Sequence, residues 1–115
     1  MIEDSPAYRS AIEAALAEVP EAELVGMAET ASDGIRLVEQ AEPDLVLTDI
    51  FLKQGTGLDV LAHYQNRPKP PQFACMTNAP STELQHHCRA LGAASFHDKA
   101  DGFEWIATLA TRTNL

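Results

Sequence analysis

Four short apolar segments each end in, or lead directly to, a side chain that can take part in phosphoryl chemistry. Asp49 closes the apolar run 44–48, which is typical of a buried parallel strand. Three other positions follow or precede similar segments: the acidic pair Glu3-Asp4, Thr77 after the run 73–76, and Lys99 after the run 95–98. Carboxylates, a hydroxyl and an ammonium group together suit a metal-assisted phosphoryl acceptor.

Strand and helix patterns alternate along the chain and predict the elements that position these groups. We expect a first helix from Ser5-Pro6 to about Val19, and a second helix capped by Ser32-Asp33 with Ile35, Val38 and Ala41 facing inward. A third helix should carry Leu58, Leu61 and Ala62 inward. A fourth should follow Pro80-Ser81, with Leu84, Cys88 and Leu91 inward. We expect strands at 23–28, 44–49, 73–77 and 93–97, with Gly92 as a left-handed helix terminator. A capping box over 101–104 predicts a last helix with Phe103, Ile106, Ala107 and Ala110 inward.

Length and charge limit the classes of protein that this chain can represent. Its 115 residues suit one domain, residues 1–115, with an α/β core and a parallel sheet. The formal charge of -9 disfavours direct binding of nucleic acid, which depends on basic side chains. No segment approaches a membrane span or a signal peptide, so we expect no membrane partner and a cytoplasmic protein with its two cysteines as free thiols.

In combination, these residues make the chain similar to the receiver domain of two-component response regulators, over nearly its whole length. The resemblance rests on Glu3-Asp4, Asp49, Gly57, Thr77, Phe96 and Lys99, each at the expected place in the order of elements. It implies a doubly wound five-stranded parallel sheet in the order 2-1-3-4-5, with helices on both faces. The first strand is truncated, because only Met1 and Ile2 precede the acidic pair. From this we expect that the native chain begins upstream or that another segment covers the gap.

The resemblance also implies a role for each site residue. Asp49 would accept a phosphoryl group from a histidine kinase or a histidine phosphotransfer protein. Mg²⁺ would be held by Asp4 directly, by Glu3 through water, by Asp49 and by the backbone carbonyl of Phe51. Lys99 would offset the incoming negative charge. Thr77 and Phe96 would act as the switch, altering an output surface made of the Leu84 helix, the Phe96 strand and the Phe103 helix. A second copy of the chain, forming a homodimer, is one candidate partner.

The sequence departs from this family at several positions. Ala100 follows Lys99 where proline in a cis bond is common, so a trans loop is expected. Asn78 and Phe51 are expected to narrow the approach of water to a phosphorylated Asp49. The lifetime of that state should then change in Asn78→Ala.

Two other functions remain open from the sequence. A degenerate receiver would act as an interaction module without phosphorylation. An aspartyl-phosphate phosphatase or phosphotransferase would need a second acid two residues after the nucleophile, where this chain has Phe51. We therefore expect a switch and not a turnover enzyme. The run His86-His87-Cys88 is not a metal site, because successive helical residues point in different directions.

Overall fold

The computed structural model describes residues 1–110, which form an alternating α/β fold. Its helices and strands, in chain order, are α1 (Pro6–Ala17), α2 (Ala31–Ala41), β1 (Leu45–Asp49), α3 (Gly57–Tyr64), β2 (Gln72–Thr77), α4 (Thr82–Ala90), β3 (Ser95–Asp98), the 3₁₀ helix η1 (Lys99–Asp101) and α5 (Glu104–Ala110). The predicted α/β class with a parallel sheet and covering helices is confirmed. The predicted capping box at the start of α5 stays a prediction.

The named strands form a parallel sheet in the order β1-β2-β3. Leu47 lies opposite Ala74 in the first pair, and Cys75 lies opposite Phe96 in the second. Because the strands are parallel, Asp49, Thr77 and Asp98 all reach the same edge of the sheet. This is the edge at which open α/β sheets place their functional groups.

The N-terminal residues lie beside β1 but do not form a regular strand. The Ile2 N–H donates to the Leu47 carbonyl over 2.8 Å, and the Asp49 N–H donates to the Ile2 carbonyl over 2.9 Å. On the other side, the Glu3 N–H donates to the Ala28 carbonyl over 2.8 Å. This first segment is therefore short and is joined to each neighbour by an isolated bridge.

The prediction of a regular strand at 23–28 is wrong, since this segment contains only isolated bridge residues. Its neighbour along the sheet offers a paired stretch of just Met1 to Glu3, so few ladder hydrogen bonds are available to it. Within residues 1–110 the sheet has three regular strands, and the five-strand order 2-1-3-4-5 is not confirmed.

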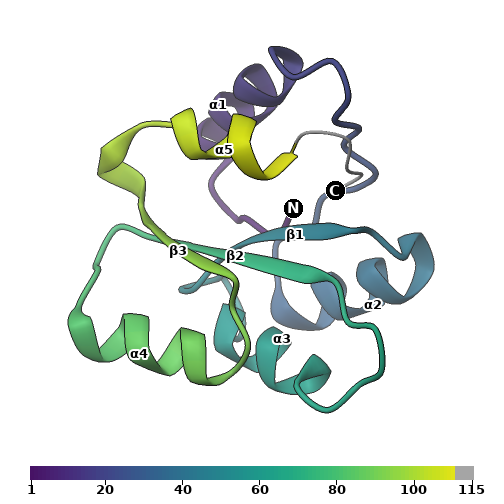
Figure 1. The fold of residues 1–115 in the computed structure, drawn as a ribbon, viewed down its shortest axis with the longest axis vertical. Coiled ribbons are helices and arrows are strands. Elements are labelled where there is room, and N and C mark those ends of the chain that lie inside the picture. Colours follow the sequence, from purple (N-terminus) through teal and green to yellow (C-terminus); the bar gives the residue numbers. More distant parts are fainter. Residues whose placement is uncertain (111–115) are drawn as a thin grey trace.

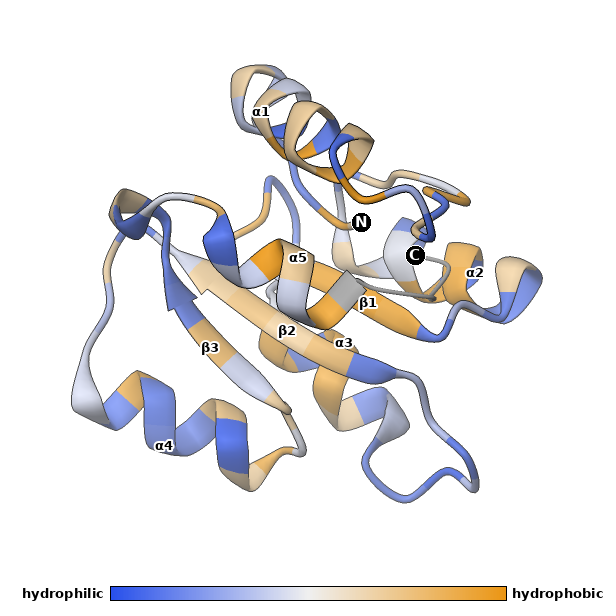
Figure 2. Cartoon of the chain, turned by 45° about the horizontal axis from the view of Figure 1, so that its top comes forward, coloured by the Kyte–Doolittle hydropathy of each residue, from blue (hydrophilic) through white to orange (hydrophobic). Residues whose placement is uncertain are grey.

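Helices cover both faces of the sheet, as Figure 1 shows, with α1 and α5 on one side and α2, α3 and α4 on the other. The apolar residues of β1 and β2 alternate between the two cores, so both strands carry a continuous run of hydrophobic residues (Figure 2). The core under α2 to α4 includes Val46, Phe73, Cys75 and Cys88, and the core under α1 and α5 includes Leu45, Leu47, Ala74, Met76 and Ile106.

Side-chain caps set the beginnings of the helices. Ser5 and Ser81 cap α1 and α4 as predicted. The cap of α2 is Thr30, not Ser32-Asp33, because Thr30 has an extended backbone and its hydroxyl accepts the Asp33 N–H over 3.1 Å. Gly92 has the predicted left-handed conformation, with φ of 105°.

For two residues, the predicted inward orientation is wrong. Ala62 and Ala107 are exposed, whereas Tyr64 is buried in α3 and Trp105 and Leu109 pack against the core from α5. Larger side chains remove more apolar surface from water, so they take the inward positions. The side chain of Ala110, predicted to face inward, lies outside the described residues. No helix within residues 1–110 is both long and apolar enough to cross a bilayer.

Candidate functional site

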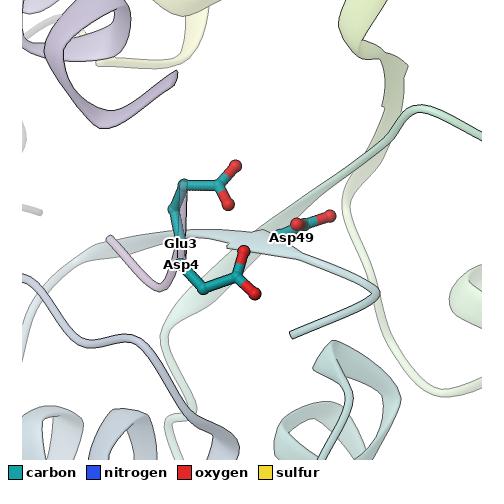
Figure 3. Close-up of side chains that lie close together, drawn as sticks. All are labelled: Glu3, Asp4 and Asp49. Carbon is teal, nitrogen blue, oxygen red and sulfur yellow. The ribbon is translucent and has the colours of Figure 1, made fainter. Parts of the chain in front are cut away.

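The carboxyl groups of Glu3, Asp4 and Asp49 gather at the end of β1 (Figure 3). The pairing of Ile2 with β1 brings the acidic pair beside Asp49, although 45 or more positions separate them in the sequence. One oxygen from each of the three carboxylates lies within 4.8 Å of the others. Glu3 and Asp49 are buried and Asp4 is half-buried, so the predicted acidic cluster is present.

Lys99 reaches into this cluster from the far end of the chain. Its Nζ donates to Oε1 of Glu3, and it donates to Oδ2 of Asp49 over 3.1 Å. The Lys99 side chain is 6% exposed, and those of Glu3 and Asp49 are 0% and 8% exposed. Because this ammonium group is almost fully removed from water, its attraction to the carboxylates is much stronger than that of a solvent-exposed lysine.

The loop that carries Lys99 is the short helix η1. The Asp98 carboxylate caps it by accepting the Ala100 N–H over 2.9 Å. No cis peptide bond occurs in the described residues, so the bond before Ala100 is trans as expected. Lys99 reaches Asp49 in this conformation.

Charge in the site is unbalanced. With all three carboxylates ionised, the ammonium group of Lys99 leaves two negative charges unmatched. Burial raises the pKa of Asp4, and so do its hydrogen bond to Glu3 and the negative charge of Glu3. Hard carboxylate oxygens with this excess of negative charge are the donors that Mg²⁺ prefers, so the residues present fit that ion.

The predicted switch and neighbouring residues are less directly connected to the cluster. Thr77 is fully buried at the end of β2, and its Oγ1 accepts the Ala79 N–H over 3.0 Å. Phe96 is half-buried and packs against the core beneath α4. Asn78 is exposed, and Phe51 is 54% exposed. The roles of these residues, including the Phe51 carbonyl as a metal ligand, stay predictions.

Gly57 packs against the backbone that carries Asp49. Its N–H donates to the Ile50 carbonyl over 2.8 Å. A Cβ at this position would lie 2.5 Å from the carbonyl oxygen of Asp49 and 3.2 Å from Thr48 Oγ1. Since the closest atom belongs to the backbone, it cannot rotate away. Glycine therefore lets α3 begin directly against the end of β1.

We expect Gly57→Ala to lower the free energy of unfolding by about 1–3 kcal/mol, because α3 or β1 must shift to admit the methyl group. Urea unfolding monitored by circular dichroism measures the change. Gly26→Ala is the matched control, since the three atoms nearest to its Cβ all belong to the Leu37 side chain, which can rotate. Equal losses in the two variants would contradict this explanation.

Tyr8, on α1, is a residue near the site that sequence reasoning missed. Its ring centroid lies 4.3 Å from Lys99 Nζ, and its ring also contacts that of Phe103, with centroids 5.5 Å apart. Burial raises the pKa of the Tyr8 hydroxyl to about 12, assisted by the negative charges of Glu3, Asp49 and Asp98. No spacing pattern in the sequence links a residue of the first helix to a lysine 91 positions later.

Arg9 is a second residue that sequence reasoning missed. Its Nη1 donates to the Glu3 carbonyl and to Oε1 of Glu29, both over 2.9 Å. This arginine therefore links the backbone of the acidic pair to the segment that follows Ala28. The two partners lie 6 and 20 positions away, and neither separation forms a recognisable motif.

Comparisons with known proteins agree on one family. A sequence model described as the response regulator receiver domain matches residues 1–111. The transcription regulator BvgA of Bordetella pertussis is 28% identical over 110 residues, which cover 96% of this chain and 52% of BvgA. A protein-glutamate methylesterase/protein-glutamine glutaminase of Agrobacterium fabrum is 37% identical over 71 residues, covering 61% of this chain and 20% of that protein.

Solved structures show the same fold. The signal receiver domain of the response regulator NarL from Mycobacterium tuberculosis superposes with a TM-score of 0.86 at 21% identity, covering 93% of this chain and 86% of that one. A LuxR-family DNA-binding response regulator from Staphylococcus aureus gives a TM-score of 0.85 at 20% identity, covering 93% and 89%. The chain spans about half the length of BvgA and a smaller share of the methylesterases.

Proposed function

This chain belongs to the response regulator receiver domain family, and on that premise we propose that it is a Mg²⁺-dependent phosphoacceptor switch modified on Asp49. The observation that carries the proposal is the contact of Lys99 with both Asp49 and Glu3 inside a buried acidic cluster. A structural ion pair needs one carboxylate for each ammonium group. Three carboxylates around one lysine leave an excess of negative charge, which a divalent cation would neutralise so that a negatively charged phosphoryl group can approach Asp49.

The proposed reaction transfers one phosphoryl group to the Asp49 carboxylate. A carboxylate oxygen attacks phosphorus, the P–N bond of a partner's phosphohistidine breaks, and its electron pair stays on the imidazole nitrogen. Bound Mg²⁺ would supply positive charge for the phosphoryl oxygens, and Asp4, Asp49 and the Phe51 carbonyl would hold it, with Glu3 acting through water. Lys99 stabilises the charge that develops on the transferred group, and its ammonium group acts strongly because it and Asp49 are largely removed from water.

The switch itself is part of the same proposal. The Thr77 hydroxyl would donate to a phosphoryl oxygen, and Phe96 would then turn inward. Both lie on β2 and β3, next to α4, so their movement would alter the surface formed by α4, β3 and α5. An output protein would read that surface, and a second copy of the chain is another candidate. A histidine kinase or phosphotransfer protein would be the phosphoryl donor, and a cytoplasmic location belongs to this proposal.

The decisive experiment is phosphorylation with acetyl phosphate, in which the P–O bond breaks and acetate leaves. We expect an added phosphoryl mass on the parent protein when Mg²⁺ is present, and none after EDTA treatment or in Asp49→Asn. Asp44→Asn is the control, because Asp44 immediately precedes β1 and so lies at the end of the strand away from Asp49. Intact-protein mass spectrometry distinguishes these cases.

Failure of the parent protein to take up a phosphoryl group would instead favour a degenerate receiver that acts as an interaction module. Multiple turnovers of acetyl phosphate with no accumulated adduct would favour a phosphatase. The absence of a carboxylate at position 51 argues against that second result, because no acid stands there to assist water.

A further inference from the structure

We propose that Tyr8 is a positioning residue, whose aromatic ring holds the ammonium group of Lys99 against Glu3 and Asp49. The inference deepens the proposed function and rests on it for its catalytic consequence. The face of a tyrosine ring carries negative electrostatic potential, so a cation 4.3 Å from the centroid is attracted to it. This attraction strengthens when the cation is removed from water, and the Lys99 side chain is 6% exposed.

The surroundings of Lys99 show why a third contact matters. Its ammonium group donates to one oxygen of Glu3 and one of Asp49. Lysine has a long flexible side chain, and fixing it costs rotamer entropy. A ring on a further side of the ammonium group restricts that side chain and keeps water away. Attraction to a ring face is less directional than a hydrogen bond, so Lys99 can exchange an Asp49 oxygen for a phosphoryl oxygen while it stays near Tyr8.

Tyr8 is itself held in place by the beginning of α1. Its backbone N–H donates to Ser5 Oγ over 3.2 Å, and the Ser5 N–H donates to Oε2 of Glu3 over 3.1 Å. The same serine therefore connects the backbone of Tyr8 to the carboxylate that Lys99 contacts. The ring of Phe103, just before α5, contacts the Tyr8 ring as well.

The ring, and not the hydroxyl group, must account for this role. The Tyr8 hydroxyl is buried and has no hydrogen-bond partner within the described part of the chain. A buried hydroxyl without a partner lowers stability, since it loses its hydrogen bonds to water. If Tyr8 served only to fill space between α1 and the site, phenylalanine or leucine could take its place. These two substitutions therefore separate the ring from the hydroxyl group and from simple bulk.

The test compares Tyr8→Phe with Tyr8→Leu in the full chain. We expect Tyr8→Phe to be phosphorylated by acetyl phosphate within about 2-fold of the parent rate at saturating Mg²⁺. Tyr8→Leu should be slower by about 5- to 30-fold, which is the upper range of a cation–π contribution converted at 1.4 kcal/mol per tenfold. A Tyr8→Phe variant as slow as Tyr8→Leu would overturn the proposal, because the ring would then be insufficient.

A double-mutant cycle decides the contact without any phosphorylation. Lys99→Met keeps most of the apolar stem and removes the charge, so the cycle with Tyr8→Leu isolates the attraction between charge and ring. We expect the unfolding equilibrium constants to depart from additivity by about 5-fold or more, and additive effects would overturn the proposal. If the parent takes up no phosphoryl group, the proposed function fails while this cycle still tests Tyr8. Should Tyr8→Leu not fold, Tyr8→Met replaces it, because methionine adapts to irregular gaps.

Discussion

Lys99→Met is expected to lower the free energy of unfolding by about 3–5 kcal/mol at neutral pH in buffer without divalent cations. The substitution leaves Glu3, which is fully buried, beside Asp49 with no compensating ammonium group. An unpaired charge in a buried position loses its hydration and gains nothing in return. Chemical denaturation in EDTA measures this loss.

Mg²⁺ should restore part of the stability of Lys99→Met, because a divalent cation can neutralise the same carboxylates. Phosphorylation by acetyl phosphate should nevertheless remain about 10²–10³-fold slower, the usual effect of removing one charge-stabilising donor. Lys53→Met is the control, since Lys53 is exposed. If both lysine variants unfold at the same denaturant concentration in EDTA, the Lys99 ion pairs contribute nothing to stability.

For the chain of residues 1–115, whose terminal amino group is that of Met1, stability should also fall as pH decreases from 8 to 5. Met1 is 2% exposed, and its terminal amino group donates to the Gly26 carbonyl over 3.1 Å. Burial lowers the pKa of this amino group from 8.0 to about 5. Between these values the unfolded chain binds a proton that the folded chain does not, so protonation favours unfolding.

As far as this amino group decides it, the free energy of unfolding is highest above pH 8, falls between pH 8 and pH 5, and falls no further below pH 5. The total decrease is about 4 kcal/mol at most, since each pKa unit corresponds to about 1.4 kcal/mol. Urea unfolding between pH 5 and pH 8 measures it. Acetylation of the Met1 amino group removes the titrating charge and keeps an N–H donor, so the acetylated protein is the matched control. An equally steep pH dependence in the acetylated protein would assign the effect to other groups.

Several elements could be predicted from local sequence because their causes are local. The apolar runs around Val46 and Ala74 indicate buried parallel strands, and β1 and β2 form there. Ser5 and Ser81 have the side chains that cap helices, and both do so. The misplaced cap of α2 has an equally local cause. Thr30, Ser32 and Asp33 are all good capping residues, and only the extended backbone at Thr30 decides among them.

The sheet at its N-terminal edge was harder to predict. The segment 23–28 has a strand-like composition, but hydrogen bonding to a neighbour makes a strand, and Met1 to Glu3 offer few partners. Inward positions on α3 and α5 depended on which side chains the sheet could accommodate. Ala62 and Ala107 fit the helical spacing, yet Tyr64 and Trp105 bury more apolar surface.

By itself, the sequence determined that carboxylates, a hydroxyl and a lysine stand at the ends of apolar segments, because strand periodicity and strand ends are local properties. Only the tertiary structure decided that Lys99 contacts both Glu3 and Asp49, that Tyr8 covers its ammonium group, and that Gly57 touches the backbone of Asp49. These contacts join residues 8 to 96 positions apart. Their distances depend on how the helices pack against the sheet, and no local pattern encodes that packing.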